Sequence, residues 1–143
     1  KIPLYNSHGV ASKKFIELAG GAAEGTYLPA GKLLIVDQLA KNDPQRKVLT
    51  DYKNSYESKF GGSANTFGGH AYDAFQIAVK AIQNLVEKNT KVTHATIRNE
   101  LENIKGFVGT GGIFNFSAED HNGLTKEGFV LIEIENGDWK LAE

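Results

Sequence analysis

The four histidines are the first side chains to consider for binding a metal or transferring a proton. They are His8, His70, His94 and His121, and none belongs to an H-E-x-x-H pattern. That pattern places two histidines on one face of a helix, as a zinc site needs. The chain also has no cysteine, which excludes thiolate zinc sites and disulfides. We therefore expect no metal and no cofactor.

Asp120 and His121 form an adjacent acid–base pair. A hydrolase or transferase using this pair is one hypothesis, and it predicts turnover that is lost on His121→Ala. General base catalysis needs a nucleophile and an orienting partner nearby, and the following Asn122-Gly123 supplies neither. We favour a turn held by hydrogen bonds from side chain to backbone, and we expect that the protein is not an enzyme.

The glycine-rich stretch Gly109-Thr110-Gly111-Gly112 has some likeness to a phosphate-binding loop. It lacks the lysine of the G-x-x-x-x-G-K-[ST] pattern, and strand-forming residues follow it. We expect no phosphate binding there.

The stretch Asn6-Ser7-His8-Gly9 lies between an apolar run and a helical pattern. The end of a strand that opens into a helix is where α/β proteins present ligand-binding groups. Ser7 and His8 could both reach a ligand, and the alternative is a plain loop with exposed polar side chains. Asn6, Ser7, His8 and Gly9 are therefore candidate ligand-binding residues.

Aromatic residues gather at the beginning of the longest helical pattern. Phe67, His70 and Tyr72 lie around Gly68-Gly69. They could line a pocket beside a flexible entry, although Phe67 and Tyr72 could equally belong to the core. His70 and Tyr72 join the candidate ligand-binding residues.

The first forty residues predict a strand, a loop and a helix that would position these groups. Residues 2–5 read as a strand, and the apolar spacing from Val10 to Ala19 predicts a short helix that ends at Gly20-Gly21. Residues 25–28 favour a second strand, stopped by Pro29. The apolar run 33–36 fits either a further strand or an extended crossing between lobes.

Three helices are expected in the middle of the chain. Asp43-Pro44 is typical of a helix start, and the helix should end near Lys59 with its inward stripe at Val48, Leu49, Tyr52, Tyr56 and Phe60. The longest helix should bury Ala71, Phe75, Ala78, Val79, Ile82, Leu85 and Val86. Thr93 should cap a third helix that ends before Gly106.

The last third of the chain predicts strands. Residues 107–116 combine aromatic and β-branched residues with glycines, which favours β structure over helix. Residues 130–135 alternate in polarity before Asn136-Gly137, the dipeptide that best tolerates a type I′ turn. We therefore predict a terminal β-hairpin. The best boundaries between parts of the chain are residues 29–42 and 105–112.

Length and charge limit the classes of partner. The chain has 143 residues, 41% of them hydrophobic, which is typical of one globular domain. Its formal charge of -1 is spread evenly, and no basic cluster exceeds Lys13-Lys14. We therefore expect no nucleic-acid partner, and no apolar run is long enough to span a membrane.

Taken in order, several segments resemble the type I periplasmic solute-binding proteins of the branched-chain amino acid class. Each is weakly specific by itself, whereas the ordered series spans nearly the whole chain. The segments are 1–4, 9–11, 22–27, 43–44, 59–61, 69–74, 81–82, 106–112, 116–117 and 120–124.

The resemblance implies an α/β chain that is the C-terminal part of a two-lobed fold with flavodoxin-like lobes and a terminal β-hairpin. Residues 1–30 would be a segment of the second lobe with the ligand loop, and 31–105 a helical segment of the first lobe. Residues 106–143 would return as a β-rich segment ending in the hairpin.

The implied function is the periplasmic, or otherwise extracytoplasmic, binding of a small solute by hinge closure, with delivery to an ABC permease. Amino-acid binders of the family carry an acidic residue where this chain has His8. Because a neutral imidazole supplies no negative charge to an ammonium group, we expect an organic acid, an aromatic carboxylate or an amide as the solute. A ligand-sensing regulatory domain of the same fold is the alternative.

The chain begins with Lys1 and contains no methionine, so we interpret it as an excised piece of a longer protein. Such a piece would expose apolar faces that its missing partners cover. We therefore expect it to form a homodimer, for example by exchanging segments, or to rearrange.

Overall fold

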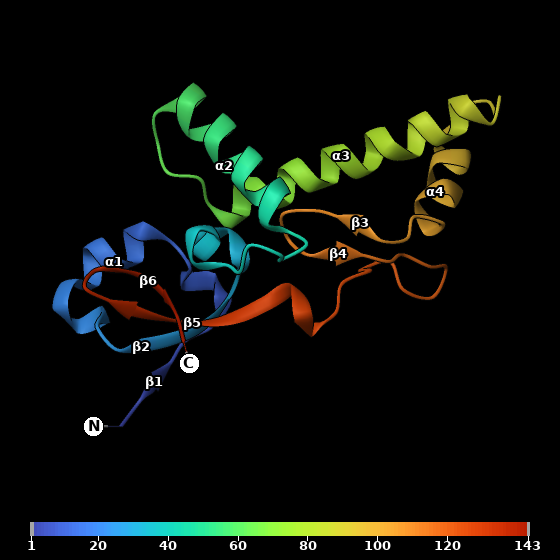
Figure 1. Cartoon of the computed structure of the whole chain (residues 1–143). Helices are drawn as coiled ribbons and strands as arrows, with labels where there is room; N and C mark the ends of the chain where they lie inside the picture. The colour runs from blue at the N-terminus through green and yellow to red at the C-terminus, as the bar shows by residue number, and fades with distance from the viewer. Residues whose placement is uncertain (1, 143) are drawn as a thin grey trace.

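The computed structural model describes residues 2–142, and both ends of the chain contribute to its main sheet (Figure 1). The strands are β1 (Leu4–Tyr5), β2 (Thr26–Gly31), β5 (Phe129–Glu135) and β6 (Asp138–Leu141), in the order β1-β2-β5-β6. β1 is parallel to β2, whereas β5 is antiparallel to both β2 and β6. The N-terminal strands are thus held together with the C-terminal hairpin.

The predicted terminal hairpin is confirmed. Asn136 and Gly137 join β5 to β6 with φ values of 54° and 72°, the double positive φ of a type I′ turn. The carboxylate of Glu24 accepts hydrogen bonds from both backbone N–H groups, at 2.9 Å from Asn136 and 2.7 Å from Gly137. The turn is therefore fixed to the segment that precedes β2.

Pro29 does not end its strand, contrary to expectation. β2 continues to Gly31, and Pro29 pairs with Leu131 of β5. On the other side of β2, β1 pairs only with Thr26 and Tyr27, so β2 is an edge strand on that side at Pro29. A proline is tolerated there because its missing N–H would have had no partner.

The apolar run 33–36 is helical, so both the strand and the extended crossing were wrong. It lies in η3 (Lys32–Gln38), a 3₁₀ segment with a kink at Ile35, where φ is -127°. Leu33, Ile35 and Val36 are all buried in the main core. A helical backbone buries three neighbouring apolar side chains here, whereas a strand would have turned alternate ones outward.

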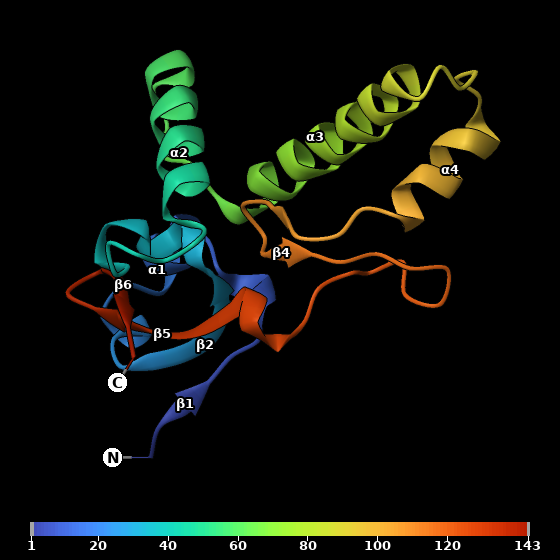
Figure 2. The same ribbon diagram turned by 45° about the vertical axis from the view of Figure 1, so that its right-hand side comes forward.

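The middle of the chain forms helices that extend away from the sheet (Figures 1 and 2). α1 (Lys13–Ala19) precedes η2 (Gly20–Ala23), and α2 (Arg46–Phe60) leads into α3 (Thr66–Glu87) and α4 (His94–Glu102). The short strands β3 (Phe107–Val108) and β4 (Ile113–Phe114) pair beside α3. Two 3₁₀ turns, η1 (His8–Val10) and η4 (Lys126–Gly128), complete the order.

The predicted start of α4 and end of α2 are confirmed, whereas α2 begins two residues after the expected Pro44. Thr93 forms a capping box with Thr96 at the start of α4, and Gly61 ends α2 with φ 69°. Asp43 accepts a hydrogen bond from the Gln45 N–H at 2.8 Å, and the regular helix begins at Arg46.

The apolar stripe expected on α3 was wrong, except at Leu85. The structure buries a different face of the helix, which consists of Thr66, Gly69, Asp73, Ile77, Ala81 and Leu85. Phe75 is 65% exposed and Val86 61% exposed. On α2, Leu49 and Tyr52 are buried as expected, whereas Phe60 is exposed.

Two apolar clusters stabilise the molecule. The larger joins the sheet to α1, η3 and α2 through residues such as Leu28, Ile35, Leu49 and Ile132. The smaller lies in the projecting part and has four buried members, which are Ile77, Ala81, Ile104 and Phe114. The candidate ligand-binding residues His8 and His70 lie where these two parts meet.

Candidate functional site

The loop after β1 presents His8 toward the beginning of α3. The Asn6 N–H donates to the Tyr27 carbonyl at 2.8 Å, which extends the pairing of β1 with β2 by one residue. The chain then turns through η1, where the Ala11 N–H donates to the His8 carbonyl at 3.0 Å. Ser7 and Gly9 are exposed on either side of His8.

Three rings surround the imidazole of His8. Its ring centroid lies 5.6 Å from Phe129, 6.2 Å from His70 and 6.3 Å from Phe67. The Nε2 atom of His8 is buried and has no hydrogen-bond partner among the described residues. Burial lowers the pKa of His8 below its ordinary value of 6.5, and the neighbouring His70 lowers this pKa further.

His70 reaches this position because α3 is fixed at its first turns. The Asn65 side chain accepts a hydrogen bond from the Gly68 N–H at 2.9 Å, which caps the helix. One turn after His70, the buried carboxylate of Asp73 accepts hydrogen bonds from the Thr110 N–H and the Gly111 N–H, both at 2.7 Å. The Thr110 hydroxyl donates to the same carboxylate at 3.1 Å.

The glycine-rich segment 109–112 therefore packs against α3. A β-carbon on Gly109 would lie 2.8 Å from the Asp73 carboxylate, and one on Gly111 would lie 3.0 Å from Nδ1 of His70. Gln45 also donates from Nε2 to the Gly109 carbonyl at 2.9 Å. These glycines permit a close approach of the backbone to Asp73 and His70, a structural role that explains them without a phosphate.

Of the candidate residues, the structure brings the loop 6–9 together with His70 and places Tyr72 elsewhere. The Tyr72 ring lies 5.0 Å from Tyr52 on α2, and its hydroxyl accepts a hydrogen bond from Gln76 at 2.7 Å. Phe129, by contrast, lies against His8 although it was not among the residues selected from the sequence. No local pattern around Phe129 marks it as part of a site.

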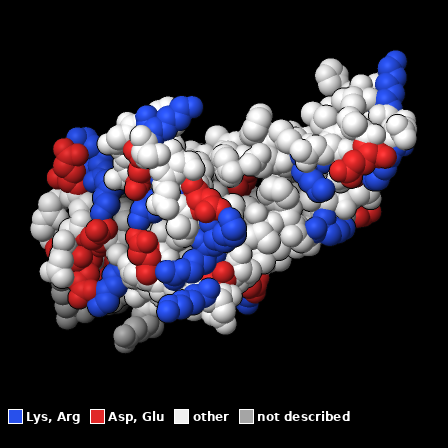
Figure 3. Space-filling view, turned by 45° about the horizontal axis from the view of Figure 1, so that its top comes forward, with Lys and Arg blue, Asp and Glu red and all other residues white. Residues whose placement is uncertain are grey.

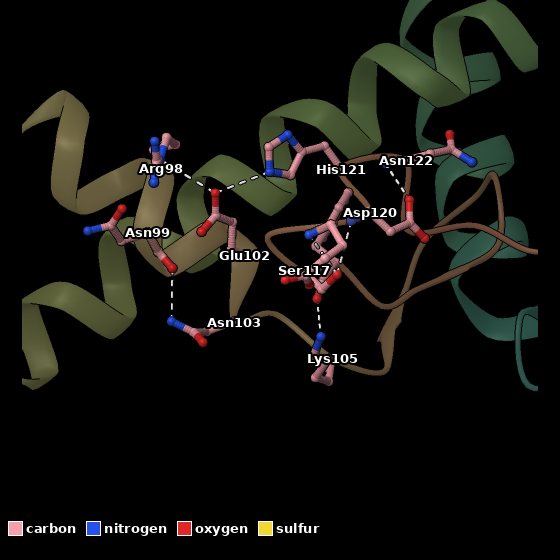
Figure 4. Close-up of polar contacts among 11 residues, drawn as sticks. Arg98, Asn99, Glu102, Asn103, Lys105, Ser117, Asp120, His121 and Asn122 are labelled. Carbon is pink, nitrogen blue, oxygen red and sulfur yellow. Dashed lines mark hydrogen bonds and ion pairs between the residues drawn. The ribbon is translucent and has the colours of Figure 1, made fainter.

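The side chains of Asp120 and His121 have different hydrogen-bond partners (Figure 4). The Asp120 carboxylate accepts hydrogen bonds from the Asn122 N–H at 2.9 Å and the Gly123 N–H at 3.0 Å, which confirms the expected turn. The His121 Nε2 atom instead lies 3.1 Å from Glu102, whose carboxylate is also 3.4 Å from Nε of Arg98.

An apolar groove of about 1060 Å³ lies between α3, α4 and the segment 114–129. His70 and Phe129 line it together with Ile77, Phe114 and Leu124, and the charged residues Arg98, Glu102 and Lys126 also border it. Figure 3 shows charged side chains gathered at the sheet-bearing end and at the far tip, with a largely uncharged stretch between them.

Within residues 2–142, no group of three or more histidine and acidic side chains could hold a metal ion. No helix in this part of the chain is long and apolar enough to cross a membrane.

The profile of one protein family, described as periplasmic binding protein, matches residues 1–138. Among curated protein sequences, none matches this chain significantly.

Several solved structures share the fold. Rp1789 from Rhodopseudomonas palustris strain CGA009 is 25% identical with a TM-score of 0.90, and the comparison covers 100% of this chain and 41% of that one. An extracellular ligand-binding receptor from Rhodopseudomonas palustris HaA2 is 27% identical with a TM-score of 0.88, covering 99% and 40%.

The branched-chain amino acid transporter substrate binding protein LivJ from Streptococcus pneumoniae, in complex with isoleucine, is 21% identical with a TM-score of 0.76, covering 100% and 37%. At that identity the likeness concerns the fold alone. The chain thus spans about two fifths of the length of the structures that it resembles.

Proposed function

This chain belongs to the periplasmic binding protein family, and on that premise we propose that it is the C-terminal part of an extracytoplasmic solute receptor. Residues 1–30 belong to the second lobe, 31–105 to the first, and 106–143 return across the hinge. The whole receptor closes on a small solute and delivers it to an ABC permease. The remainder of the receptor supplies the other wall of the solute recess.

The observation that carries the proposal is the buried, unpartnered Nε2 atom of His8. A buried polar atom without a partner is unfavourable by about 1–3 kcal/mol, and such atoms are rare in folded proteins. His8 lies at the junction between the sheet and α3, the two parts that a hinge would move relative to each other. A solute that enters this junction offers the missing partner, together with His70 and the exposed Ser7 and Gly9.

The chemistry of the site is that of binding without reaction. Catalysis would require a nucleophile beside a base, and Asp73 and Asp120, which lie close in sequence to His70 and His121, already accept hydrogen bonds from backbone N–H groups. Asp73 accepts three hydrogen bonds from Thr110 and Gly111, and Asp120 holds its own turn. His8 and His70 are therefore donors and acceptors for a bound molecule.

Ligand-dependent melting of the full-length protein that contains this chain tests the proposal. A solute at one hundred times its Kd stabilises the folded state by about 2.7 kcal/mol, which a thermal melt detects readily. We expect the shift to disappear in His8→Ala and to persist in the matched control His94→Ala, because His94 is exposed on α4. A shift that His8→Ala leaves intact would place the solute elsewhere and refute the proposal.

A further inference from the structure

Two Asn-Gly dipeptides in this chain, Asn122-Gly123 and Asn136-Gly137, can undergo deamidation. In this reaction the backbone nitrogen of glycine loses its proton to solvent and attacks the side-chain carbonyl carbon of asparagine. Glycine has no side chain that obstructs the approach. Ammonia leaves, a cyclic succinimide forms, and water opens the ring to aspartate or isoaspartate. The net change consumes one water molecule and releases one ammonia molecule, so water is the only co-reactant.

The turn at Asn122-Gly123 is held by packing and by hydrogen bonds. Gly123 is buried, and its N–H donates to the Asp120 carboxylate at 3.0 Å. A β-carbon on Gly123 would lie 2.8 Å from the Phe116 ring, so the nitrogen that would attack belongs to a tightly packed residue. The Asn122 side-chain amide donates to the Leu124 carbonyl at 3.3 Å. These contacts must break before the glycine nitrogen can reach the asparagine side chain.

The turn at Asn136-Gly137 is open by comparison. Both residues are exposed, and a β-carbon on Gly137 would have no neighbour within 4 Å. Within the described part of the chain, the side-chain amide of Asn136 has no hydrogen-bond partner. The asparagine side chain can therefore rotate toward the backbone nitrogen without losing a contact.

The carboxylate of Glu24 opposes the reaction at this open turn. It accepts hydrogen bonds from the Gly137 N–H at 2.7 Å and from the Asn136 N–H at 2.9 Å. The nitrogen that must attack is thus held away from the asparagine side chain. The negative charge of Glu24 also disfavours loss of the Gly137 proton, because a second anion would form beside the first.

We propose that Asn136 is a site of spontaneous deamidation, that the hydrogen bonds from Glu24 limit its rate, and that the packing around Gly123 preserves Asn122. The proposal is independent of solute binding. It concerns a modification that the same dipeptide undergoes in one turn and resists in the other because of the surrounding structure.

Deamidation at Asn136 would disturb the strand that follows it. Isoaspartate adds a methylene group to the backbone of a two-residue turn, whereas the register of β5 with β6 pairs Ile134 with Trp139 across that turn. β6 is the edge strand of the main sheet, and the Gln38 side chain of η3 donates to the Trp139 carbonyl at 2.8 Å (Figure 1). The new carboxylate would also lie beside Glu24. We expect β6 to loosen from η3 in the isoaspartate form.

Incubation of the full-length protein that contains this chain, in mildly alkaline buffer over several days, measures both rates in one sample. Peptide mass mapping detects the replacement of NH₂ by OH at each asparagine, and chromatography separates isoaspartate from aspartate. We expect Asn136 to convert at least about tenfold faster than Asn122 in the folded protein, because attack at Asn122 requires a buried turn to open. In denaturant the two rates should agree within about twofold, since neither turn is then formed.

Substitution of Glu24 tests its role. Glu24→Ala releases both N–H groups and should accelerate conversion of Asn136 about tenfold, the factor that corresponds to loss of one hydrogen bond to a charged acceptor. Glu24→Gln keeps an uncharged acceptor and should give an intermediate rate. The matched control Glu17→Ala removes an acid that is paired with Lys14 at the surface of α1, and it should leave the rate at Asn136 unchanged.

Three results would overturn the proposal. Conversion of Asn122 as fast as Asn136 in the folded protein would show that packing does not protect the first turn. An unchanged rate at Asn136 in both Glu24 variants would remove Glu24 from the explanation. If Asn136 stays intact in the folded wild type and in Glu24→Ala while the denatured protein converts, Asn136 is not a deamidation site. Hydrogen exchange at the Leu141 amide, which donates to Gln38 at 2.8 Å, should be faster in the isoaspartate form, and equal exchange would refute the loosening of β6.

Discussion

The hydrogen bonds of Asp73 lead to a quantitative prediction about how α3 is attached to the rest of the molecule. Asp73→Ala removes an acceptor that serves the Thr110 N–H, the Gly111 N–H and the Thr110 hydroxyl. Each buried donor that loses its partner is unfavourable by about 1–3 kcal/mol. Water entering the space left by the carboxylate offsets part of this, so we expect a loss of about 3–5 kcal/mol in the free energy of unfolding.

Two further substitutions make the measurement specific. Asp73→Asn keeps the shape and one good acceptor but turns an amide N–H₂ toward a backbone donor, so we expect about half the effect of alanine. Asp51→Ala removes an acidic residue from α2 that is paired with Lys47 at the surface, and it should change stability by less than about 0.5 kcal/mol.

Urea unfolding followed by circular dichroism measures these differences, and hydrogen exchange at the Thr110 and Gly111 amides reports the local effect. Because domains are stable by only about 5–15 kcal/mol, a loss of the expected size is a large shift in midpoint. Equal stabilities for Asp73→Ala and Asp51→Ala would refute the reasoning that Asp73 holds the 109–112 segment to α3.

Three other predictions concern packing, pH and association. Gly109→Ala should lower the free energy of unfolding by about 1–3 kcal/mol because of the 2.8 Å contacts with Asp73 and Phe114, whereas Gly62→Ala, with no neighbour within 4 Å, should be neutral or slightly stabilising in the same urea titrations. The free energy of unfolding should be constant above about pH 6.5 and fall below it, because the fold favours neutral His8 while the unfolded chain binds the proton more readily. If the same dependence on pH were measured in His8→Gln, this explanation would be contradicted. Light scattering should detect dimers of this chain, and Phe75→Lys should return them to monomers, because Phe75 is a large apolar side chain of α3 that is exposed to solvent. A monomer at high concentration would count against association.

Local patterns in the sequence were sufficient to predict features that depend on the backbone conformation of a few neighbouring residues. The hairpin depended on a dipeptide that tolerates two positive φ values, and the start of α4 on a threonine that can cap its own helix. These features are decided within a few residues, so no knowledge of distant contacts was needed.

Features that depend on distant neighbours were not predicted. α3 itself carries apolar residues on more than one of its faces. Their spacing alone did not show that the face with Asp73 is the buried one. Its burial depends on hydrogen bonds to residues 37 and 38 positions further along the chain. Likewise, Pro29 is tolerated because β1 is short, which no pattern around Pro29 reveals.

Which of the candidate residues lie together in the structure was predicted only in part, for the same reason. The loop 6–9 was selected because a strand end is a general place for ligand groups, and His70 because it is one of the aromatic residues near the glycines that lead into the longest helix. Phe129 was missed since only the pairing of β5 with β2 carries it back to His8. Tyr72 was selected beside His70 in sequence, yet nearby residues of a helix point in different directions, and its ring lies against α2 instead.

A crystal structure of the full-length protein with a bound solute tests the central claim most directly. The account predicts that the solute lies against both His8 and His70, with one polar group within hydrogen-bond distance of His8 Nε2 and with Phe67 or Phe129 displaced. A solute bound without contact to either histidine, with Nε2 still buried and unpartnered, would contradict it.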